Sequence, residues 1–246
     1  MSGPGDAGAG TPREPLGAPL ATARLVERPN RFLVRARRED GVVEAHLPNP
    51  GRLEELMVTG RRLRLRPADG AGRKTDWTAV LVETPAGDGW VSLDTTLPNR
   101  LVGRALRRGW IEELAGWSPE EAEVSLGASR LDFVLADGER RLALEVKSVT
   151  LVREGIGLFP DAVTARGTRH VRELAGLAGR AGWEAAVLFV AQRPNVERVV
   201  ADEEIDPEFA VALREARAAG VRALARRCRV DESAVTLGEA LPVGRG

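Results

Sequence analysis

Cysteine, tyrosine and long apolar runs are scarce or absent in this sequence, and each shortage excludes a class of protein. The single cysteine, Cys228, permits no internal disulfide and no thiolate metal cluster within one chain, which fits a reducing compartment. No stretch approaches the ~20 consecutive apolar residues that a membrane-spanning helix needs. We therefore expect a cytoplasmic protein that does not insert into a membrane. The absence of tyrosine disfavours recognition of single strands by base stacking.

An excess of charge of one sign is also missing. Lys plus Arg and Asp plus Glu each number 36, whereas domains that bind nucleic acid are often strongly basic. Lysine occurs only at Lys74 and Lys147, so each lysine is informative where it stands. The sequence contains no Gly-x-x-x-x-Gly-Lys loop, and Gly155-Ile156-Gly157 lacks the third glycine of a dinucleotide site. These absences disfavour a small-molecule enzyme that uses a nucleotide.

The first part of the chain has the pattern of a small β-barrel. Residues 1–19 are rich in Gly, Ala and Pro and do not resemble a secretory signal, so we expect a flexible tail. Turn formers then separate short β-like runs at Phe32–Arg37, Val42–Leu47, Arg61–Arg66, Ala79–Glu83 and Trp90–Leu93. One or two helical turns are expected at 52–57. This order predicts an OB-like five-stranded barrel over residues 20–96, with an SH3-like barrel as the alternative.

A second domain is predicted over residues 97–241. Asn99 is expected to cap its first helix. The following segments are strand-like at 123–126, 130–136, 141–151, 185–191 and 221–225, and helical at 164–181 and 207–219. This order predicts a mixed central sheet flanked by helices, so the whole chain is α+β. Residues 242–246 are expected to form a second tail.

Two carboxylates and a lysine are predicted to share one face of this sheet. Side chains alternate along a strand, so Glu145 and Lys147 lie on the same face of the run 141–151. Asp137-Gly138 is a hairpin signal, and a two-residue turn places Asp132 one diagonal step from Glu145. A four-residue loop places Asp132 directly opposite Glu145. In both registers Asp132, Glu145 and Lys147 converge.

Converging carboxylates are costly unless a cation lies between them. We therefore expect Asp132 and Glu145 to hold Mg²⁺, or Mn²⁺, because such hard cations bind carboxylates beside phosphate. The ion would activate a water and polarise a phosphoryl oxygen, while Lys147 would position that water or stabilise the charge of the transition state. The predicted reaction is hydrolysis of a phosphodiester. The alternative is that Glu145 and Lys147 form a structural ion pair on a partly solvated sheet.

This arrangement resembles the PD-(D/E)xK nuclease superfamily, with Leu131 in the place of the motif's proline. Several strings also occur in an order similar to that of the sugar fermentation stimulation protein family (SfsA): Arg31-Phe32, Pro48-Asn49-Pro50-Gly51, Pro98-Asn99-Arg100, Arg130-Leu131-Asp132-Phe133, Glu145-Val146-Lys147-Ser148-Val149-Thr150 and Phe159-Pro160-Asp161-Ala162-Val163-Thr164. The resemblance covers residues 20–241. It implies an OB-like domain, a restriction-endonuclease-like domain, DNA binding with little sequence preference and a regulatory link to sugar metabolism, without establishing cleavage.

Further acidic residues are candidates for the same site. Nucleases of this class often recruit another acid from the region of the first helix, and Glu123 and Glu113 are placed for this role. The alternative for both is a solvated carboxylate. Asp161 is expected either to bind metal or to hold the turn before the helix that begins near Thr164.

Basic residues are candidates for contacts with DNA phosphates. They form alternating strand faces and helix faces: Arg62, Arg64 and Arg66; Arg35 and Arg37; Arg100, Arg104, Arg107 and Arg108; and Arg166, Arg169 and His170. A solvated strand face is the alternative for the barrel arginines. For His170 the alternative is a neutral side chain that caps a partner or is tucked against the apolar stripe of the helix. Contacts made mainly to the phosphate backbone of the DNA favour a duplex as the partner.

Two functions remain open at this stage. The first is a Mg²⁺-dependent nuclease with little sequence specificity. The second is a non-catalytic DNA-binding regulator of sugar (maltose) metabolism that retains the nuclease fold and an ion site. The intact set of Asp132, Glu145 and Lys147 favours the nuclease, and the oligomeric state stays open, with a homodimer among the alternatives.

Overall fold

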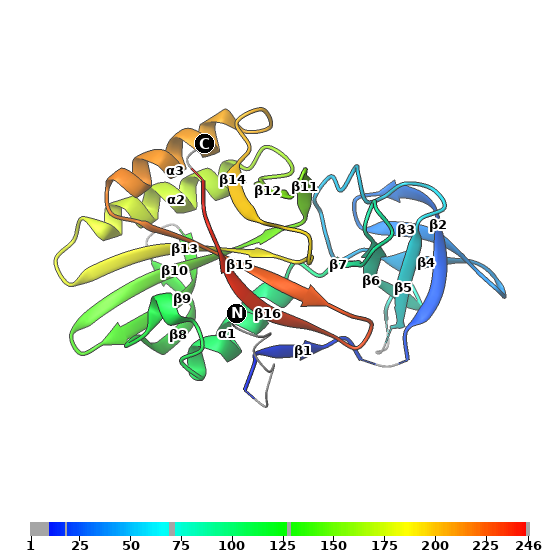
Figure 1. Ribbon diagram of the computed structural model, residues 1–246, viewed down its shortest axis with the longest axis horizontal. Helices are drawn as coiled ribbons and strands as arrows, with labels where there is room; N and C mark the ends of the chain where they lie inside the picture. Colours follow the sequence, from blue (N-terminus) through cyan, green and yellow to red (C-terminus); the bar gives the residue numbers. More distant parts are fainter. Residues whose placement is uncertain (1–9, 18, 69–71, 127–128, 245–246) are drawn as a thin grey trace, which may run out of the picture.

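The polypeptide forms a β-barrel lobe and a larger lobe built on a mixed sheet, which lie side by side (Figure 1). The computed structural model describes residues 10–17, 19–68, 72–126 and 129–244. The order of the lobes along the chain agrees with the predicted order, an OB-like barrel followed by a nuclease-like domain.

Five strands close the barrel: β2 (Ala21–Asn30), β3 (Leu33–Arg38), β4 (Gly41–His46), β5 (Arg62–Pro67) and β6 (Trp77–Glu83). Neighbouring strands pair antiparallel, and a parallel pairing of β4 with β6 completes the ring. Buried and exposed side chains alternate along β3, where Val34 and Ala36 enter the barrel core. The closed five-stranded barrel confirms the OB-like prediction.

The strands of the barrel differ in part from the predicted ones. The longest, β2, was not predicted, because its buried apolar residues Ala23 and Leu25 stand among charged residues and a proline. The last predicted run corresponds to β7 (Trp90–Ser92), which extends the sheet beyond β6 instead of closing the ring. One or two helical turns were expected between β4 and β5. The chain forms a single turn there, in which two backbone N–H groups donate to the carbonyl of Leu53.

Seven strands form the central sheet of the second lobe, in the order β1-β16-β15-β13-β10-β9-β8. Their bounds are β1 (Arg13–Pro15), β8 (Ser118–Leu126), β9 (Ser129–Asp137), β10 (Arg140–Val149), β13 (Trp183–Ala191), β15 (Arg222–Val230) and β16 (Ala234–Leu241). β10, β13 and β15 run parallel, and the flanking pairs run antiparallel. β13 is buried from Ala185 onward, as expected for a strand covered on both faces. This mixed sheet confirms the predicted fold class.

Helices cover both faces of the sheet (Figure 1). α1 (Leu97–Arg107) packs on one face, where Leu101 and Leu142 belong to one buried apolar cluster. α2 (Ala165–Ala178) and α3 (Pro207–Ala218) pack on the other face. A short 3₁₀ helix, η1 (Glu112–Leu114), follows α1. Among the described helices, none has the length and apolarity that a bilayer crossing requires.

A small three-stranded sheet near the junction of the lobes was not predicted. It contains β11 (Leu151–Arg153), β12 (Ile156–Phe159) and β14 (Arg198–Ala201), with β12 in the middle. The predicted run 141–151 therefore ends in a new strand instead of continuing β10. β12 leads into the loop before α2, so this sheet positions the start of that helix.

Both expected tails take part in the fold. β1 pairs antiparallel with β16, and Leu16 is buried in the apolar cluster beneath α1. At the other end, Val243 forms a bridge with Val199 of β14. The prediction of flexible tails over 1–19 and 242–246 is therefore wrong for these segments, because pairing satisfies the edge of β16 and buries Leu16. Residues 1–9, 18, 245 and 246 of those tails lie outside the described residues.

The two lobes share buried contacts. Val80 and Leu81 of the barrel strand β6 belong to the same apolar cluster as Leu101 of α1. On the rim of this contact, Arg64 of β5 pairs with Glu232 at 2.5 Å. The barrel is thus packed against the second lobe through its own core residues.

Candidate active site

Glu145 lies in the middle of β10, buried between β9 and β13, and only 3% of it is exposed. Its Oε1 atom accepts a hydrogen bond from Lys147 Nζ at 2.7 Å and lies 2.5 Å from His170 Nδ1. Its Oε2 atom is buried and has no hydrogen-bond partner among the described residues. Burial would raise the pKa of Glu145, but the contacts of His170 and Lys147 outweigh burial and hold that pKa below its ordinary value.

His170 approaches Glu145 from α2. The helix begins after Thr164, whose hydroxyl accepts a hydrogen bond from the Gly167 N–H and thereby caps it. Arg166 Nε donates to His170 Nε2 at 3.3 Å, which leaves the ring proton on Nδ1, where it is donated to Glu145. His170 is 3% exposed. The prediction that His170 faces phosphate is corrected accordingly: the ring is buried against the carboxylate, as the alternative reading expected.

Asp132 lies on β9 beside Glu145. The register between β9 and β10 pairs Asp137 with Arg140 at one end and Phe133 with Leu144 at the other. Extended by one residue, it places Asp132 opposite Glu145. This is the second of the two predicted registers, although the turn consists of residues 138 and 139.

Two hydrogen bonds hold the Asp132 carboxylate. Its Oδ2 atom accepts from the Val146 backbone N–H at 2.8 Å, and its Oδ1 atom accepts from Asn99 Nδ2 at 2.7 Å. Burial, together with the negative charge of Glu145, raises the pKa of Asp132 above its ordinary value. The structure therefore brings together two carboxylates, and at Asp132 burial and the charge of Glu145 outweigh the hydrogen bonds and the Lys147 charge that oppose them.

Asn99 is a site residue that the sequence pattern misplaced. The helix begins three residues earlier than expected, after Thr96 instead of Asn99, with Pro98 in its first turn. Asn99 is consequently inside α1 and its side chain reaches Asp132 instead of capping the helix. The signal was Pro98, because proline favours the first positions of a helix and so moves the cap to a preceding residue.

The carboxylate pair fits a divalent cation. The free Oε2 atom of Glu145 and the Asp132 carboxylate offer hard oxygen ligands, and a cation would offset the repulsion that raises the Asp132 pKa. The described residues contain no group of three or more His, Cys, Asp or Glu side chains arranged to hold a metal. This set suits Mg²⁺ or Mn²⁺ better than zinc, because Mg²⁺ commonly uses one or two carboxylates and completes its shell with water and phosphate.

An open pocket of about 390 Å³ adjoins Asp132. Its wall includes Arg100, Arg104 and Arg107 of α1, and Glu123 lies on its rim. Glu123 is exposed and pairs with Arg130, so it shares the pocket with Asp132 without a hydrogen bond to it. Glu123 thus remains a predicted member of the site.

The weaker acidic candidate Glu113 lies elsewhere. Its carboxylate pairs with the Arg226 guanidinium, which also lies 5.1 Å from the centre of the Trp110 ring. Glu113 therefore holds β15 to the segment after α1 and does not line the pocket beside Asp132.

Comparison with known proteins places the chain in a family. The model for the sugar fermentation stimulation protein RE domain matches residues 96–234, and the model for the SfsA N-terminal OB domain matches residues 26–93. The chain belongs to the SfsA family. Its curated relatives include sugar fermentation stimulation protein homologues of Shouchella clausii, 48% identical over 92% of this chain and 97% of the relative, and of Chloroflexus aurantiacus, 46% identical over 98% and 93%.

A solved structure supports the same assignment. Pyrococcus furiosus SfsA in complex with Ca²⁺ superimposes with a TM-score of 0.84 at 29% identity, and the match covers 93% of this chain and 97% of that chain. The agreement extends over both lobes, so the fold described above is that of the SfsA family.

Most of the arginines predicted to contact DNA are paired within this SfsA chain. The pairs are Arg35 with Glu27 and Glu44, Arg62 with Glu83, Arg64 with Glu232, Arg100 with Glu14 and Asp94, and Arg104 with Glu14. Arg66 Nη1 donates to the Leu16 carbonyl at 3.0 Å. These contacts differ from both roles expected for the barrel arginines, because Arg64 and Arg66 on the strand face of β5 help to join the lobes.

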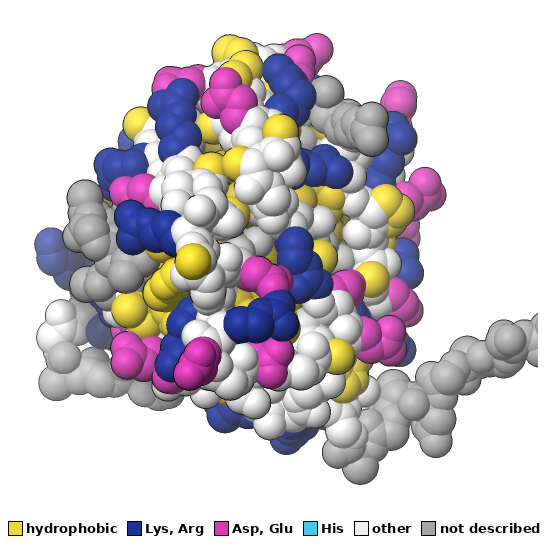
Figure 2. Space-filling view, turned by 90° about the vertical axis from the view of Figure 1, so that its left-hand side faces the viewer, with side chains coloured by type: hydrophobic (Ala, Val, Ile, Leu, Met, Phe, Trp, Pro, Cys, Tyr) yellow, Lys and Arg dark blue, Asp and Glu magenta, His cyan; other side chains and the backbone are white. Residues whose placement is uncertain are grey.

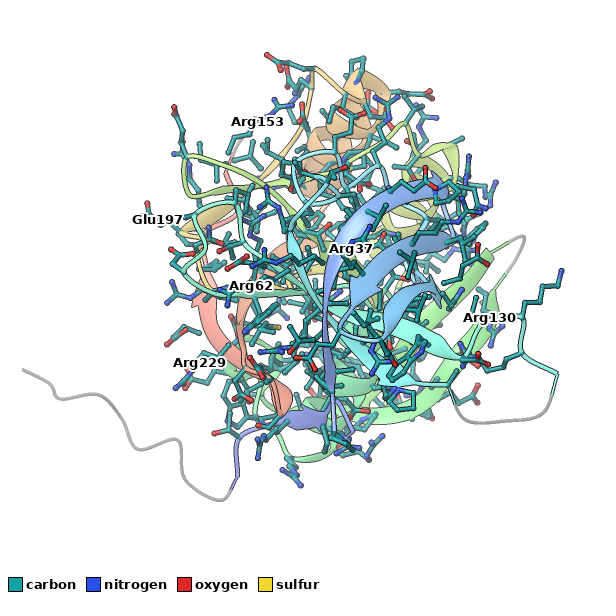
Figure 3. All side chains as sticks on the ribbon, turned by 90° about the vertical axis from the view of Figure 1, so that its right-hand side faces the viewer. Arg37, Arg62, Arg130, Arg153, Glu197 and Arg229 are labelled. Carbon is teal, nitrogen blue, oxygen red and sulfur yellow. The ribbon has the colours of Figure 1, made fainter. Side chains whose placement is uncertain are left out.

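Other predicted arginines are exposed. Arg37 lies on the barrel side of the molecule (Figure 3), and Arg166 and Arg169 are exposed on α2. On the face of the sheet lobe turned away from the barrel, positive and negative side chains are interspersed (Figure 2). A DNA contact therefore remains a prediction for individual arginines and not for a large patch of one charge.

Asp161 joins the two lobes of the SfsA fold. It lies in the loop between β12 and α2, and the nearby backbone N–H groups of Leu53 and Arg52 in the barrel lobe act to lower the pKa of its carboxylate. Gly51 lies so close that a Cβ atom there would overlap Asp161 Oδ2. Burial raises the Asp161 pKa above its ordinary value. Of the two roles expected for Asp161, these contacts favour the structural one.

Proposed function

We propose that this SfsA-family chain is a DNA-binding, metal-dependent phosphodiester hydrolase with little sequence preference, which acts on DNA in the cytoplasm. The observation that carries the proposal is the state of Glu145. One carboxylate oxygen is held by Lys147 and His170, whereas the other is buried and unpartnered among the described residues, across from Asp132. A buried carboxylate oxygen without a partner is costly unless a ligand such as a metal ion meets it.

The surrounding residues fit this role. His170 and Lys147 fix the rotation of the Glu145 carboxylate, and Asn99 together with the Val146 N–H fixes that of Asp132. A divalent ion, when bound, would polarise a phosphoryl oxygen. It would also lower the pKa of a bound water, so that hydroxide forms near neutral pH. Lys147 presents its ammonium beside the same carboxylate, where it would stabilise negative charge that builds up on the phosphate.

The partner and the ion have separate support. Barrels of the OB type use one face and its loops to bind oligonucleotides. Of the three α1 arginines that line the pocket beside Asp132, Arg107 forms no ion pair with a described residue and suits contact with a phosphate. The relative from Pyrococcus furiosus is described in complex with Ca²⁺, a divalent cation that binds oxygen ligands as Mg²⁺ does.

A regulator that binds DNA without cleaving it is the second candidate. The observation that favours it is that Lys147 and His170 both contact the same oxygen of Glu145, and that no third acidic or histidine ligand completes a metal-binding group among the described residues. Such a site could retain an ion for structure or for metal-gated DNA binding. The role in sugar (maltose) metabolism belongs to this candidate.

Cleavage of labelled DNA separates the two candidates. Duplex and single-stranded substrates are incubated with Mg²⁺ or Mn²⁺ and wild type, Glu145→Gln or Lys147→Met, and DNA binding is measured in parallel by filter retention. We expect products from the wild type, and a rate lower by at least about 100-fold in both variants, the usual loss when a group that stabilises the transition state is removed. Arg172→Gln, at an exposed position of α2 that is outside the predicted DNA contacts, is the matched control. Binding without metal-dependent products would favour the regulator.

A further inference from the structure

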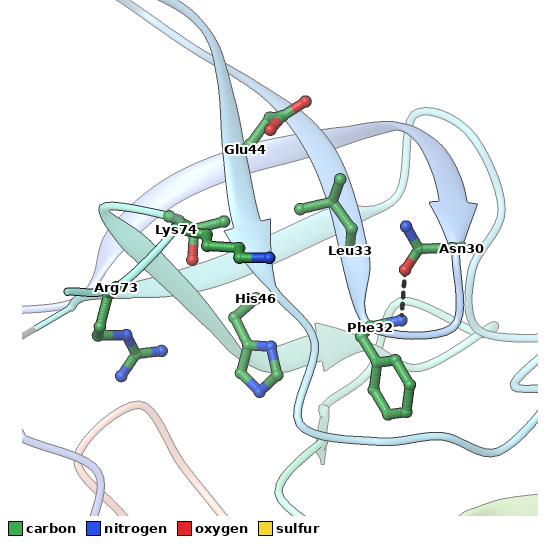
Figure 4. Close-up of a pocket in the computed structure, with 8 residues that line it drawn as sticks. Asn30, Phe32, Leu33, Glu44, His46, Arg73 and Lys74 are labelled. Carbon is green, nitrogen blue, oxygen red and sulfur yellow. Dashed lines mark hydrogen bonds between the residues drawn. The ribbon is translucent and has the colours of Figure 1, made fainter.

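A second pocket, of about 540 Å³, opens on the barrel (Figure 4). Asn30 and Phe32 line it from the connection between β2 and β3, and His46 lines it from the end of β4. Arg73 and Lys74 line it from the segment that leads into β6. The pocket thus combines an aromatic ring, an imidazole and two cationic groups.

Phe32 differs from four of the five tryptophan rings. The rings of Trp77, Trp90, Trp110 and Trp117 each lie under an arginine guanidinium, 4.3–5.8 Å from ring centre to Cζ. Phe32 has no such cover among the described residues and is 51% exposed. Its backbone N–H donates to Asn30 Oδ1 at 2.9 Å, which fixes the tight turn that presents the ring. In Figure 4 the Phe32 and His46 rings lie at the same end of the pocket.

The charge of the pocket is positive. Its acidic residue, Glu44, is held by Arg35 Nε at 3.0 Å. Arg73 is anchored to the Thr78 hydroxyl by a 2.9 Å hydrogen bond and remains exposed. Lys74 is exposed and forms no ion pair with a described residue. An ammonium and a guanidinium beside an exposed ring are the groups that recognise a phosphate next to a base.

Exposed basic residues lead from this pocket toward the loop before α2. A neighbouring pocket shares Asn30 with it and continues past Arg31 and Arg52 to Val163. Both arginines are exposed. Val163 lies one residue before Thr164, which caps the helix α2 that carries His170. A strand held at Phe32 would pass these arginines toward the loop before α2.

We propose that the Phe32 pocket holds one unpaired nucleotide of a DNA strand, with its base stacked on the Phe32 ring and its phosphate at Arg73 and Lys74. The position agrees with the barrel topology, because OB-like barrels bind oligonucleotides between the loops that join their first to their second and their fourth to their fifth strands. The preferred substrate is then a duplex with a single-stranded end, in place of the fully paired duplex that the sequence favoured. The inference rests on the proposed DNA partner but not on cleavage.

The test uses a duplex with a short single-stranded end that carries a fluorescent adenine analogue flanked by abasic sugars, so that only the protein can stack on it. Full-length protein is titrated without divalent ions, and both total binding and quenching of the analogue are recorded. We expect quenching by the wild type and by Phe32→Tyr, and none by Phe32→Leu. Phe32→Leu should bind the tailed duplex roughly 5-fold to 150-fold more weakly, the contribution of one stacked base.

Matched controls separate this inference from the proposed function. Val42→Ala, which removes an equally exposed apolar side chain from the same barrel, should change neither signal. Tight binding of tailed and blunt duplexes alike, without quenching, would refute the stacking of an unpaired base on Phe32. The proposed DNA-binding function would be unaffected by that result. Failure to bind either duplex would refute both proposals. Equal quenching of a free adenine-analogue monophosphate at the same protein concentration would also overturn the inference, because the pocket would then be a mononucleotide site.

Discussion

Glu145 and His170 stand 25 residues apart in the chain and meet in a buried contact of 2.5 Å between Glu145 Oε1 and His170 Nδ1. The contact ties the central strand β10 to the helix α2 and turns the other carboxylate oxygen of Glu145 toward a position without a partner among the described residues. In metal sites, outer residues that orient a ligand in this way commonly affect metal affinity.

We predict that the substitution His170→Gln weakens binding of the divalent ion. The variant loses the donor that fixes Glu145, so the concentration of Mn²⁺ that gives half of the maximal cleavage rate, or half of the ion-induced stabilisation, should rise about 10-fold to 100-fold. The rate at saturating ion should change much less. Arg172→Gln, an exposed position on α2 outside the predicted DNA contacts, serves as control. An unaltered Mn²⁺ midpoint in a correctly folded His170→Gln protein would show that the contact serves the fold alone.

The stabilisation by a divalent ion should depend on pH through Asp132. Without an ion, the raised pKa of Asp132 means that the folded state holds this proton more tightly, so its contribution to stability is fully present below the ordinary value of 3.8 and is lost as the pH rises through the raised pKa. Glu145 has the opposite sign: its lowered pKa contributes stability above its ordinary value of 4.5, and that contribution is lost at lower pH.

Ion binding requires both carboxylates in the ionised form. We therefore expect Mn²⁺ to raise the melting temperature at mildly alkaline pH, by the equivalent of about 2.7 kcal/mol at ~100 times its Kd, and to raise it less as the pH falls through the Asp132 pKa. Calorimetric unfolding with and without Mn²⁺ across this pH range measures the effect. A rise that is equal or larger at acidic pH argues against Asp132 as a ligand.

The contact of Gly51 with Asp161 should make Gly51 intolerant of a side chain. A Cβ atom would overlap the Asp161 carboxylate, so Gly51→Ala should lower the free energy of unfolding by about 1–3 kcal/mol, the usual cost of overpacking. Gly176→Ala provides the control, because that position in α2 has open space around it and alanine should stabilise the helix by about 0.5–1 kcal/mol. Denaturant unfolding of both variants tests the pair. Equal effects would mean that the loop at Gly51 adjusts freely.

Cys228 should be unreactive in the folded chain. Its thiol is fully buried, and burial raises its pKa to about 12, so little thiolate forms at pH values near neutrality. We expect a maleimide reagent to label the protein only after a denaturant is added, as followed by mass spectrometry. Rapid labelling without denaturant would reveal local opening of β15.

The central acidic pair and its lysine could be predicted from the sequence because a strand alternates its side chains with a period of two. That rule put Glu145 and Lys147 on one face, and the hairpin signal at Asp137-Gly138 limited Asp132 to two registers. The choice between them depends on the turn, in which residues 138 and 139 form the loop, and the sequence pattern left both open.

Contacts between distant elements could not be predicted in the same way. The approach of His170 to Glu145 depends on how α2 packs across the sheet, and the pairing of Arg64 with Glu232 depends on how the lobes meet. The strand β1 was hidden in a segment rich in Gly, Ala and Pro, because its pairing partner β16 lies at the other end of the chain. Composition reports how many charges exist, whereas their partners follow from tertiary packing.

The most direct test of the central claim starts from protein and labelled, tailed DNA already bound without divalent ion, to which Mn²⁺ is then added. The account predicts a single-turnover burst of cleaved strand from the wild type, and DNA that remains bound but intact in Glu145→Gln. Intact DNA with the wild type, or equal cleavage by Glu145→Gln, would contradict a metal-dependent nuclease site at Asp132 and Glu145.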